Sequence, residues 1–380
     1  MWAAACSAGD SPDASDSPFP AAEAQSTSGS AADPRSRSEE PRPSVVPERE
    51  LTGLNGWINS DPLTIAGLIT DGRVVLVDFW TYTCVNCIRT MPYLREWHEK
   101  YGDRGLTILG IHAPEFDFEK DRDNVIDAVQ RLGLQYPVAQ DNQMNTWRAF
   151  QNRFWPAKYL IGVDGIIRYQ HFGEGAYQQT EQEIRSALEA AGWAVGDIPL
   201  GSDEPLRDPD ATAQTRELYG GYRFNYLSIR PYAAQEQYYE DADIERLYLD
   251  DAPHKDGLWY LQGSWRNERE AIVHARTTVD FEDYIALSFR ARAVNVVLSP
   301  TREQSFVVTI ELEGRPLAPD EAGGDIEFDD HGRSIIRVDQ PRLYAIVQLP
   351  AFGERELTLR ANSDDFAVFA FTFGASLEGP

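Results

Sequence analysis

The chain has 380 residues, which is enough for two or three domains of about 100–200 residues each and for a large buried core. Its 35 basic and 61 acidic residues give a formal net charge of −26, which repels phosphate backbones and disfavours nucleic acid as a partner. No stretch approaches the roughly 20 apolar residues that cross a bilayer, so we expect no integral membrane segment.

Residues 1–50 are rich in Ala, Ser, Pro and acidic residues, and they contain few large apolar side chains. Such a segment cannot bury enough surface to offset the entropy of ordering, so we expect a disordered tether. Small residues precede Cys6 in a pattern similar to the lipobox of bacterial lipoproteins, without the charged and apolar regions that normally come before it. A lipid anchor at Cys6 and a chance cysteine in an Ala-rich tail both remain open.

Residues 51–196 alternate between strand and helix patterns, which predicts an α/β domain. Asp164 and Gly165 separate the last two strands and are typical of a hairpin turn. The expected strands are 74–80, 106–111, 136–139, 158–163 and 166–171, and the expected helices are 87–101, 123–132, 144–150 and 180–191.

Residues 197–215 are rich in Pro, Asp and Gly and are expected to be a linker. From residue 216 to 380 the hydrophobic period becomes two, with turn residues at regular spacing, which predicts an antiparallel sandwich or jelly roll. The expected strands are 258–261, 271–276, 284–291, 294–298, 306–312, 334–338, 343–349, 356–360 and 366–373.

The sharpest signal is Thr81-Tyr-Thr-Cys84-Val-Asn-Cys87, which follows the first buried strand and opens a helix. Unpaired backbone N–H groups and the helix dipole stabilise a thiolate there, so we expect Cys84 to attack and Cys87 to resolve the mixed disulfide. Zinc would need two further ligands, and the six histidines are scattered. We therefore expect no metal, and no cofactor beyond a redox-active Cys84–Cys87 disulfide.

This arrangement resembles the thioredoxin superfamily, and within it the TlpA/ResA-like envelope branch. Asp78 lies six residues before Cys84, where thioredoxins carry a buried carboxylate. Pro92 lies five residues after Cys87, where they carry the proline of the active-site helix. By this resemblance a buried Asp78 with a raised pKa would accept the proton of the resolving thiol.

Other positions match the same branch. Trp155-Pro156 precedes a strand at the place of the family's cis-proline, whose preceding residue pairs with the substrate polypeptide. The branch also carries an inserted strand and helix, expected here between residues 111 and 136, and an acidic residue near the thiols, which matches Glu115. Glu115 as a solvated loop acid remains an alternative. Trp155 and Tyr82 are candidates for the substrate groove, with a place in the core as the other interpretation.

A closer resemblance is to the soluble C-terminal portion of DipZ-type proteins, which share WTYTC-x-NC, HxPEF and a following β-sandwich over most of residues 50–376. In those proteins a membrane-embedded electron-carrying domain precedes this portion; here the lipobox-like Cys6 is a candidate lipid anchor in its place. The resemblance implies an extracytoplasmic thiol–disulfide oxidoreductase that reduces protein disulfides with electrons from a CcdA- or DsbD-type membrane partner. Thr83 and Val85-Asn86 depart from ordinary thioredoxin at positions that tune the potential, so the direction of electron flow stays open.

Two other functions are alternatives. Thr81-x-x-Cys84 matches half of the peroxidatic motif of peroxiredoxins, although Val77 stands in place of its proline. A redox-inactive envelope adaptor would instead work through a glycan-binding sandwich. The C-terminal region resembles carbohydrate-binding, galactose-binding-like jelly rolls. Three of its aromatic residues are candidates for stacking on sugar rings of the cell wall: Trp259, Tyr260 and Trp265. The competing interpretation places these rings in the sandwich core.

Overall fold

The structure is a computed structural model that describes residues 47–201, 208, 211, 213–225, 231–240, 242–251, 253–302 and 305–376. Residues 45–380 form one compact unit. Cys6 and most of the expected tether lie outside the described residues. Where the chain is described, none of its helices is both long and apolar enough to cross a bilayer.

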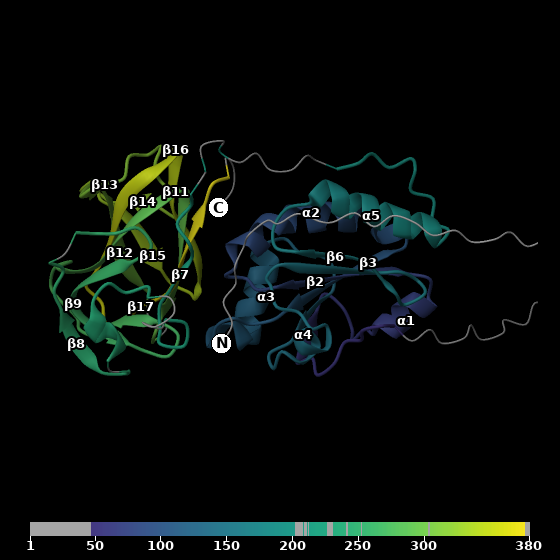
Figure 1. The fold of residues 1–380 in the computed structure, drawn as a ribbon, viewed down its shortest axis with the longest axis horizontal. Coiled ribbons are helices and arrows are strands. Elements are labelled where there is room, and N and C mark those ends of the chain that lie inside the picture. Colours follow the sequence, from purple (N-terminus) through teal and green to yellow (C-terminus); the bar gives the residue numbers. More distant parts are fainter. Residues whose placement is uncertain are drawn as a thin grey trace, which may run out of the picture. The chain divides into compact units, whose positions relative to one another are not determined.

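The first part of the unit is a mixed sheet of six strands between two layers of helices (Figure 1). The strands run in the order β1-β4-β3-β2-β5-β6, with β2, β3 and β4 parallel to one another. Strands β2 and β3 are buried along their whole length, which explains why most of their residues are apolar, with Asp78 as a buried exception in β2. The bounds are β1 (Gly56–Ile58), β2 (Val74–Trp80), β3 (Leu106–His112), β4 (Val138–Gln140), β5 (Ala157–Ile161) and β6 (Ile167–Phe172).

Helices cover both faces of this sheet because successive side chains of β2 point in opposite directions. Val74 and Leu76 pack against α2 (Val85–Tyr101), α3 (Arg122–Arg131) and α5 (Tyr177–Ala190). Val75 and Val77 pack against α1 (Ile65–Thr70) and α4 (Asn145–Ala149) on the other face. Two short 3-10 helices, η1 (Gly102–Arg104) and η2 (Asp117–Lys120), complete this part.

The α/β part begins slightly before residue 51. The backbone N–H of Glu48 donates to the carbonyl of Gly165 over 2.9 Å. The carboxylate of Glu50 accepts hydrogen bonds of 2.9 Å from the N–H groups of Ile65 and Ala66, which are otherwise unpaired in the first turn of α1. Glu48 and Glu50 therefore belong to the folded part rather than to the tether expected over residues 1–50.

Two local expectations need correction. Helix α2 begins at Val85, two residues earlier than expected, because Cys84 caps it and its sulfur accepts the N–H of Cys87 at 3.1 Å. The expectation of an inserted strand is wrong, because the described residues between β3 and β4 form η2 and α3 but no strand. Only the inserted helix is present, because Asp121 provides an N-cap for α3 through its side chain.

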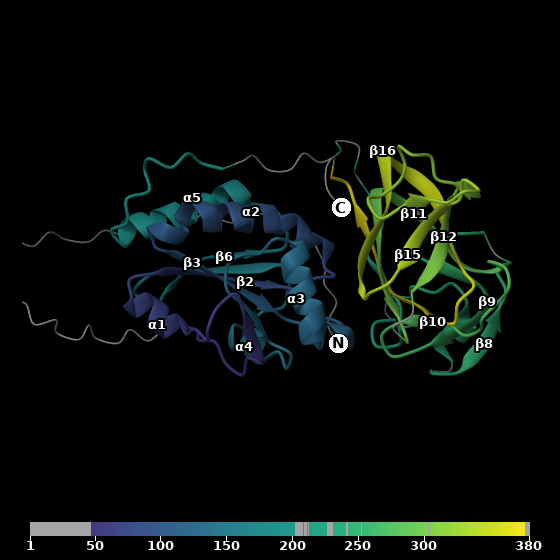
Figure 2. The same ribbon diagram turned by 180° about the vertical axis from the view of Figure 1, so that it is seen from behind.

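The C-terminal part is all-β, as expected. Its sheet runs in the order β14-β15-β12-β16-β11-β17-β10-β9-β8, with β13 beside β12 and β7 beside β17. Figure 2 shows β11, β12, β15 and β16 next to one another. The bounds are β7 (Leu218–Tyr219), β8 (Glu245–Tyr248), β9 (Trp259–Asn267), β10 (Ile272–His274), β11 (Asp283–Pro300), β12 (Phe306–Leu312), β13 (Arg315–Pro316), β14 (Glu327–Phe328), β15 (Ser334–Val338), β16 (Arg342–Ala361) and β17 (Phe366–Gly374), with the 3-10 helix η3 (Glu236–Tyr239).

Two pairs of expected strands are in fact single long strands. Strand β11 contains the expected strands 284–291 and 294–298, and β16 contains 343–349 and 356–360. The two pair antiparallel, with a register shift after Ala291, and such bulges let a strand bend and continue. The first half of β11 pairs with β9 and the second half with β17, so the strands surround one apolar core.

The end of the expected linker 197–215 is attached to the C-terminal part. The N–H of Thr215 donates to the carbonyl of Arg290 at 2.9 Å. The N–H of Asp208 donates to the carbonyl of Ala375 at 2.9 Å, and its carboxylate accepts the N–H of Phe352 at 3.1 Å.

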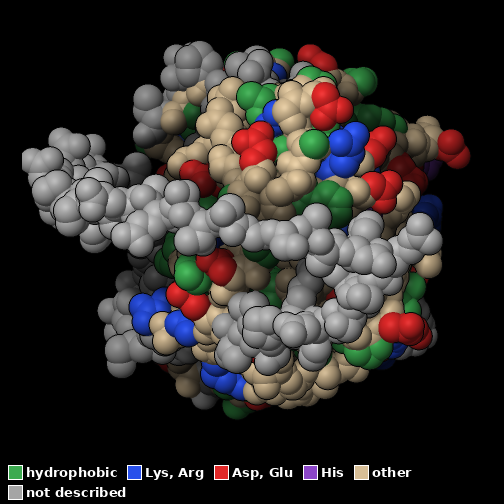
Figure 3. Space-filling model, turned by 90° about the vertical axis from the view of Figure 1, so that its right-hand side faces the viewer, with side chains coloured by type: hydrophobic (Ala, Val, Ile, Leu, Met, Phe, Trp, Pro, Cys, Tyr) green, Lys and Arg blue, Asp and Glu red, His purple; other side chains and the backbone are tan. Residues whose placement is uncertain are grey.

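On the face drawn in Figure 3, acidic and basic side chains are interspersed and no basic patch stands out.

Candidate active site

Cys84 and Cys87 form a disulfide at the N-terminus of α2, with their Cα atoms 5.2 Å apart. Cys84 is half-buried and Cys87 is completely buried. The helix continues through Pro92, and the hydroxyl of Thr90 donates to the carbonyl of Asn86 at 2.9 Å. This geometry leaves the sulfur of Cys84 the more accessible of the two, at a helix end that stabilises a thiolate.

Asp78 lies on β2, opposite Lys158 in the register of β2 against β5. Both side chains are completely buried, and the Lys158 Nζ and Asp78 Oδ1 atoms are 4.0 Å apart. Burial raises the pKa of Asp78 to about 7, although the Lys158 ammonium acts to lower it. A carboxyl group with this pKa changes its protonation near neutral pH, as a proton acceptor for a thiol requires.

Glu119 of η2 is a completely buried carboxylate that connects two loops of the site. It accepts a hydrogen bond of 2.5 Å from the hydroxyl of Thr83, the residue before Cys84. It also accepts the backbone N–H groups of Glu115 and Phe116, at 2.6 and 3.0 Å. Glu119 therefore holds the loop after β3 against the segment that carries the first cysteine.

Glu115 is half-buried, and its carboxylate accepts a hydrogen bond of 2.9 Å from the hydroxyl of Tyr219 in β7. Burial, together with the negative charges of Glu217 and Glu119, raises its pKa well above the usual value. This environment differs from that of a freely solvated loop acid. The C-terminal part thus contributes directly to the surroundings of the candidate site.

An apolar cluster joins the two parts next to the disulfide. Val85, the residue after Cys84, packs in one cluster with Phe116, Leu343 and Ala370. A Cβ atom on Gly374 of β17 would overlap the guanidinium of Arg89 in α2, so the backbone of β17 also approaches this helix closely. The C-terminal part consequently covers one side of the first turns of α2.

The two groove candidates differ in accessibility. The Trp155–Pro156 peptide bond is cis, and the half-buried Trp155 donates its indole N–H to the carbonyl of Ala113 at 3.0 Å. Tyr82 is only 1 % exposed and stacks on His112, with ring centroids 5.6 Å apart. The expectation that Tyr82 contacts substrate is therefore wrong, because its ring fills the core beneath the loop. The substrate role of Trp155 and Pro156 stays a prediction.

Comparisons with known proteins agree with this geometry. The AhpC/TSA family matches residues 47–170, and the family described as "Thioredoxin like C-terminal domain" matches residues 215–374. Protein DipZ of Mycobacterium tuberculosis is 34 % identical over 333 residues, which are 86 % of this chain and 42 % of DipZ. The α/β part is a thioredoxin-like domain.

Two further relatives match the α/β part. Thiol-disulfide oxidoreductase ResA of Bacillus thuringiensis is 32 % identical and aligns over 30 % of this chain and 63 % of its own. Thiol-disulfide oxidoreductase YkuV of Bacillus subtilis is 27 % identical over 37 % of this chain and 94 % of its own. A solved thioredoxin-like protein in the oxidised form covers 38 % of this chain and 97 % of its own at 24 % identity and a TM-score of 0.35. The chain spans less than half the length of DipZ.

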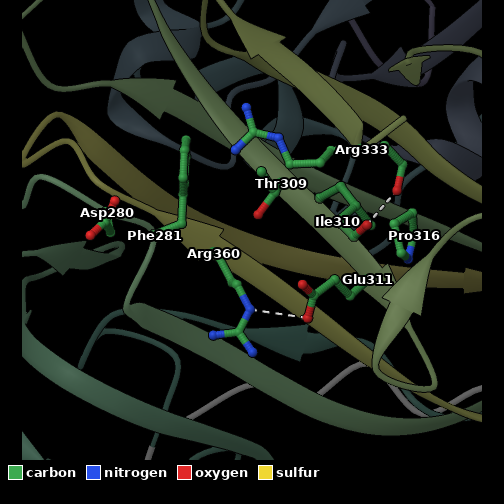
Figure 4. Close-up of a pocket in the computed structure, with 9 residues that line it drawn as sticks. Asp280, Phe281, Thr309, Ile310, Glu311, Pro316, Arg333 and Arg360 are labelled. Atoms are coloured by element: carbon green, nitrogen blue, oxygen red, sulfur yellow. Dashed lines mark hydrogen bonds and ion pairs between the residues drawn. The ribbon is translucent and has the colours of Figure 1, made fainter. Parts of the chain in front are cut away.

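The three aromatic residues expected to stack on sugar rings are buried and not accessible to a sugar. Trp259 and Trp265 are completely buried in the apolar core. Tyr260 lies outside that core cluster but is only 3 % exposed, because its ring packs on His254 and its hydroxyl donates to the carbonyl of Pro253 at 3.1 Å. The C-terminal part instead has a cavity of about 340 Å³ elsewhere (Figure 4). Its lining includes the ring of Phe281, and Arg360 and Glu311 form a 3.0 Å ion pair at its wall.

Sequence reasoning missed four residues of the site: Lys158, Glu119, Tyr219 and Glu217. For Lys158 a signal existed, because a lysine within an apolar strand of a chain with only four lysines is unusual. Glu119 lies in η2, Tyr219 in β7 and Glu217 just before β7, and these segments become neighbours only through tertiary contacts. Within the described ranges, three or more His, Cys, Asp or Glu side chains nowhere come together as a set able to hold a metal ion.

Proposed function

We propose that this protein is an extracytoplasmic thiol–disulfide oxidoreductase that reduces protein disulfides through Cys84 and Cys87. The observation that carries the proposal is the half-buried Cys84 sulfur at the N-terminus of α2, paired with a completely buried Cys87. The Cys84 thiolate attacks a substrate disulfide and releases one substrate thiolate. Cys87 then attacks the Cys84 sulfur and releases the second, so that two electrons pass to the substrate.

The half-buried Trp155 and the exposed Phe154 provide an apolar surface beside the cis peptide bond for the substrate polypeptide. The envelope location, a lipid anchor at Cys6 and a CcdA- or DsbD-type electron donor are parts of the proposal that rest on the resemblance to envelope proteins. Labelling with a radioactive fatty acid would test the anchor, and a Cys6→Ser variant that still incorporated label would contradict it.

The decisive experiment measures insulin reduction and the reduction potential of the dithiol in the Cys6→Ser background, so that only two thiols remain. A potential near −270 mV, as in thioredoxin, agrees with a reductant, and one near −120 mV indicates an oxidant. Cys84→Ser must abolish insulin reduction, whereas Asp127→Asn, an exposed change on α3, must leave it unchanged. Undiminished insulin reduction by Cys84→Ser would refute the proposal.

A thiol peroxidase is the second candidate, favoured by the AhpC/TSA family match. In that reaction the Cys84 thiolate attacks a peroxide oxygen, becomes a sulfenic acid and releases an alcohol or water. The Cys87 thiol then attacks the Cys84 sulfur, which forms the disulfide and releases the sulfenic oxygen as water. Peroxide consumption with a dithiol reductant distinguishes the candidates. Turnover of peroxide much faster than that of insulin would favour the peroxidase.

For the cell-wall glycan partner we propose the cavity of the C-terminal part in place of the buried aromatic residues. Figure 4 shows the Phe281 ring beside the cavity together with Arg333, Arg360 and Glu311, a set that suits hydroxyl-rich ligands. Retention on polysaccharide columns tests this, with Phe281→Ala expected to reduce retention and exposed Val279→Ala as the matched control. Equal retention of Phe281→Ala and the parent would exclude the cavity.

A further inference from the structure

The hydroxyl of Tyr219 lies between two carboxylates at the contact of the two parts. Its oxygen is 2.9 Å from Glu115 Oε1, on the loop after β3, and 2.9 Å from Glu217 Oε2, just before β7. Tyr219 is held in place because β7 pairs with β17, with Tyr219 opposite Ala370. We call these three residues, Glu115, Tyr219 and Glu217, the carboxyl–phenol bridge.

Counting protons shows what this bridge requires. A phenol has one proton to donate, so it can satisfy only one ionised carboxylate. The second carboxylate would face a lone pair of the phenol oxygen unless it carries a proton and donates it. Both short contacts are therefore attractive when the two carboxyl groups hold one proton between them.

The surroundings favour such a shared proton. Burial and the negative charges of Glu217 and Glu119 raise the pKa of Glu115 well above the usual value. The side chain of Glu217 is exposed, yet desolvation by the protein around its carboxyl group raises the pKa of Glu217 to about 7. Negative charge is therefore costly at both ends of the bridge.

Other charged groups face the bridge from the neighbouring segments. Arg223 donates to the carbonyl of Glu115 at 3.1 Å and forms an ion pair with Glu270. Glu270 accepts the N–H of Asp117 at 2.7 Å, and Asp117 in turn pairs with Arg269 at 2.8 Å. These contacts fix the loop backbone from the C-terminal side and leave the carboxyl group of Glu115 directed at Tyr219.

The bridge is connected to both neighbours of Cys84. Tyr219 packs against the apolar cluster that contains Val85, and Glu119 joins the backbone of Glu115 to the Thr83 hydroxyl. We propose that the carboxyl groups of Glu115 and Glu217 share one proton through the hydroxyl of Tyr219. Tyr219 and Glu217 are positioning residues, supplied by the C-terminal part, that control the charge of Glu115. The bridge exchanges no electrons; loss of its proton to solvent adds one negative charge, which disfavours the Cys84 thiolate.

This inference deepens the proposed oxidoreductase function, but its test does not depend on turnover. The rate of alkylation of the reduced full-length protein by iodoacetamide, measured against pH, reports the Cys84 thiolate. The background carries Cys6→Ser, to remove the third thiol, and Asp78→Asn, because Asp78 itself titrates at about pH 7. In this background we expect a second inflection near neutral pH, in addition to that of the thiol.

Glu217→Gln should abolish this inflection, because the amide N–H donates to the phenol oxygen permanently and leaves Glu115 ionised. Tyr219→Phe, which removes the shared hydroxyl, should displace it, and exposed Glu236→Gln should leave it unchanged. The proposal would be overturned if the pH profile of the parent lacked the second inflection. It would also be overturned if the inflection stayed at the same pH in both Glu217→Gln and Tyr219→Phe. Insulin reduction is measured separately, so a protein with the inflection but without exchange activity would refute the proposed function and leave the bridge intact.

Discussion

The Asp78→Asn substitution tests how the resolving cysteine loses its proton. Cys87 is completely buried and attacks only as a thiolate, so a nearby base must accept its proton. With a pKa of about 7, Asp78 is about one-tenth ionised at pH 6 and about nine-tenths ionised at pH 8. The resolving step should therefore become about tenfold faster between these pH values, and Asp78→Asn should slow it by about 10²-fold or more at pH 8.

Stopped-flow reaction of the reduced Cys6→Ser protein with an aromatic disulfide reagent separates the two steps. The first phase reports attack by Cys84, and the second reports displacement by Cys87 of the thiol bound to Cys84. Asp78→Asn should alter mainly the second phase, whereas exposed Asp127→Asn should alter neither. A second phase with the same rate and pH profile in Asp78→Asn and the parent would refute the role of Asp78.

The raised pKa of Asp78 also makes the folded protein less stable as the pH rises, whereas a carboxylate with a lowered pKa makes it more stable. A rise from 3.8 to about 7 on folding means that the folded state holds a proton that the unfolded state has lost. The contribution of Asp78 to stability is thus present below about pH 4 and is lost, by up to about 4 kcal/mol, as pH rises to about 7. Urea unfolding at pH 5 and 8 should show a shallower pH dependence for Asp78→Asn; an equally steep one would contradict the raised pKa.

Three further outcomes are expected. Cys87→Ser should accumulate a mixed disulfide through Cys84 in mass spectra, whereas Cys84→Ser should form none; alkylation of Cys87 alone at pH 6 would reverse the assignment. Burial acts to raise the pKa of Asp283, but hydrogen bonds from Arg276 outweigh it and lower this pKa to about 2. The Asp283 carboxylate should therefore stabilise the fold by about 2 kcal/mol above about pH 4, and this contribution should be lost as the pH falls to about 2. In urea titrations Asp283→Asn should therefore cost stability at pH 7 and little at pH 2, and an equal cost at both would count against this ion pair. Glu119→Gln should lower the free energy of unfolding by about 1–3 kcal/mol and slow the attack by Cys84, because it weakens the acceptor for two backbone N–H groups. The exposed Glu236→Gln is the control. Unchanged attack kinetics in Glu119→Gln would limit Glu119 to a structural role.

The sequence by itself determined the dithiol and the order of the two parts. The mostly apolar β2 pattern, followed by Cys84 and a helical pattern, places the cysteines at a strand–helix junction, because each of these signals is local in the chain. The change of period after residue 215 likewise identifies the all-β part. The sequence pattern divides each of the long strands β11 and β16 in two, because a bulge interrupts the alternation of side chains without ending the strand.

Only the tertiary structure decided what surrounds the dithiol. Lys158 faces Asp78 because of one particular antiparallel register, which a sequence without known pairing does not contain. Tyr219 reaches Glu115 from 104 positions further along the chain, across the contact between the two parts. The residue type of Tyr82 or Trp259 does not show whether its ring lines a groove or fills a core. Only the packing of the folded chain places both rings inside. Local periodicity encodes the elements, whereas the partners of each charged group depend on contacts between segments that are far apart in sequence.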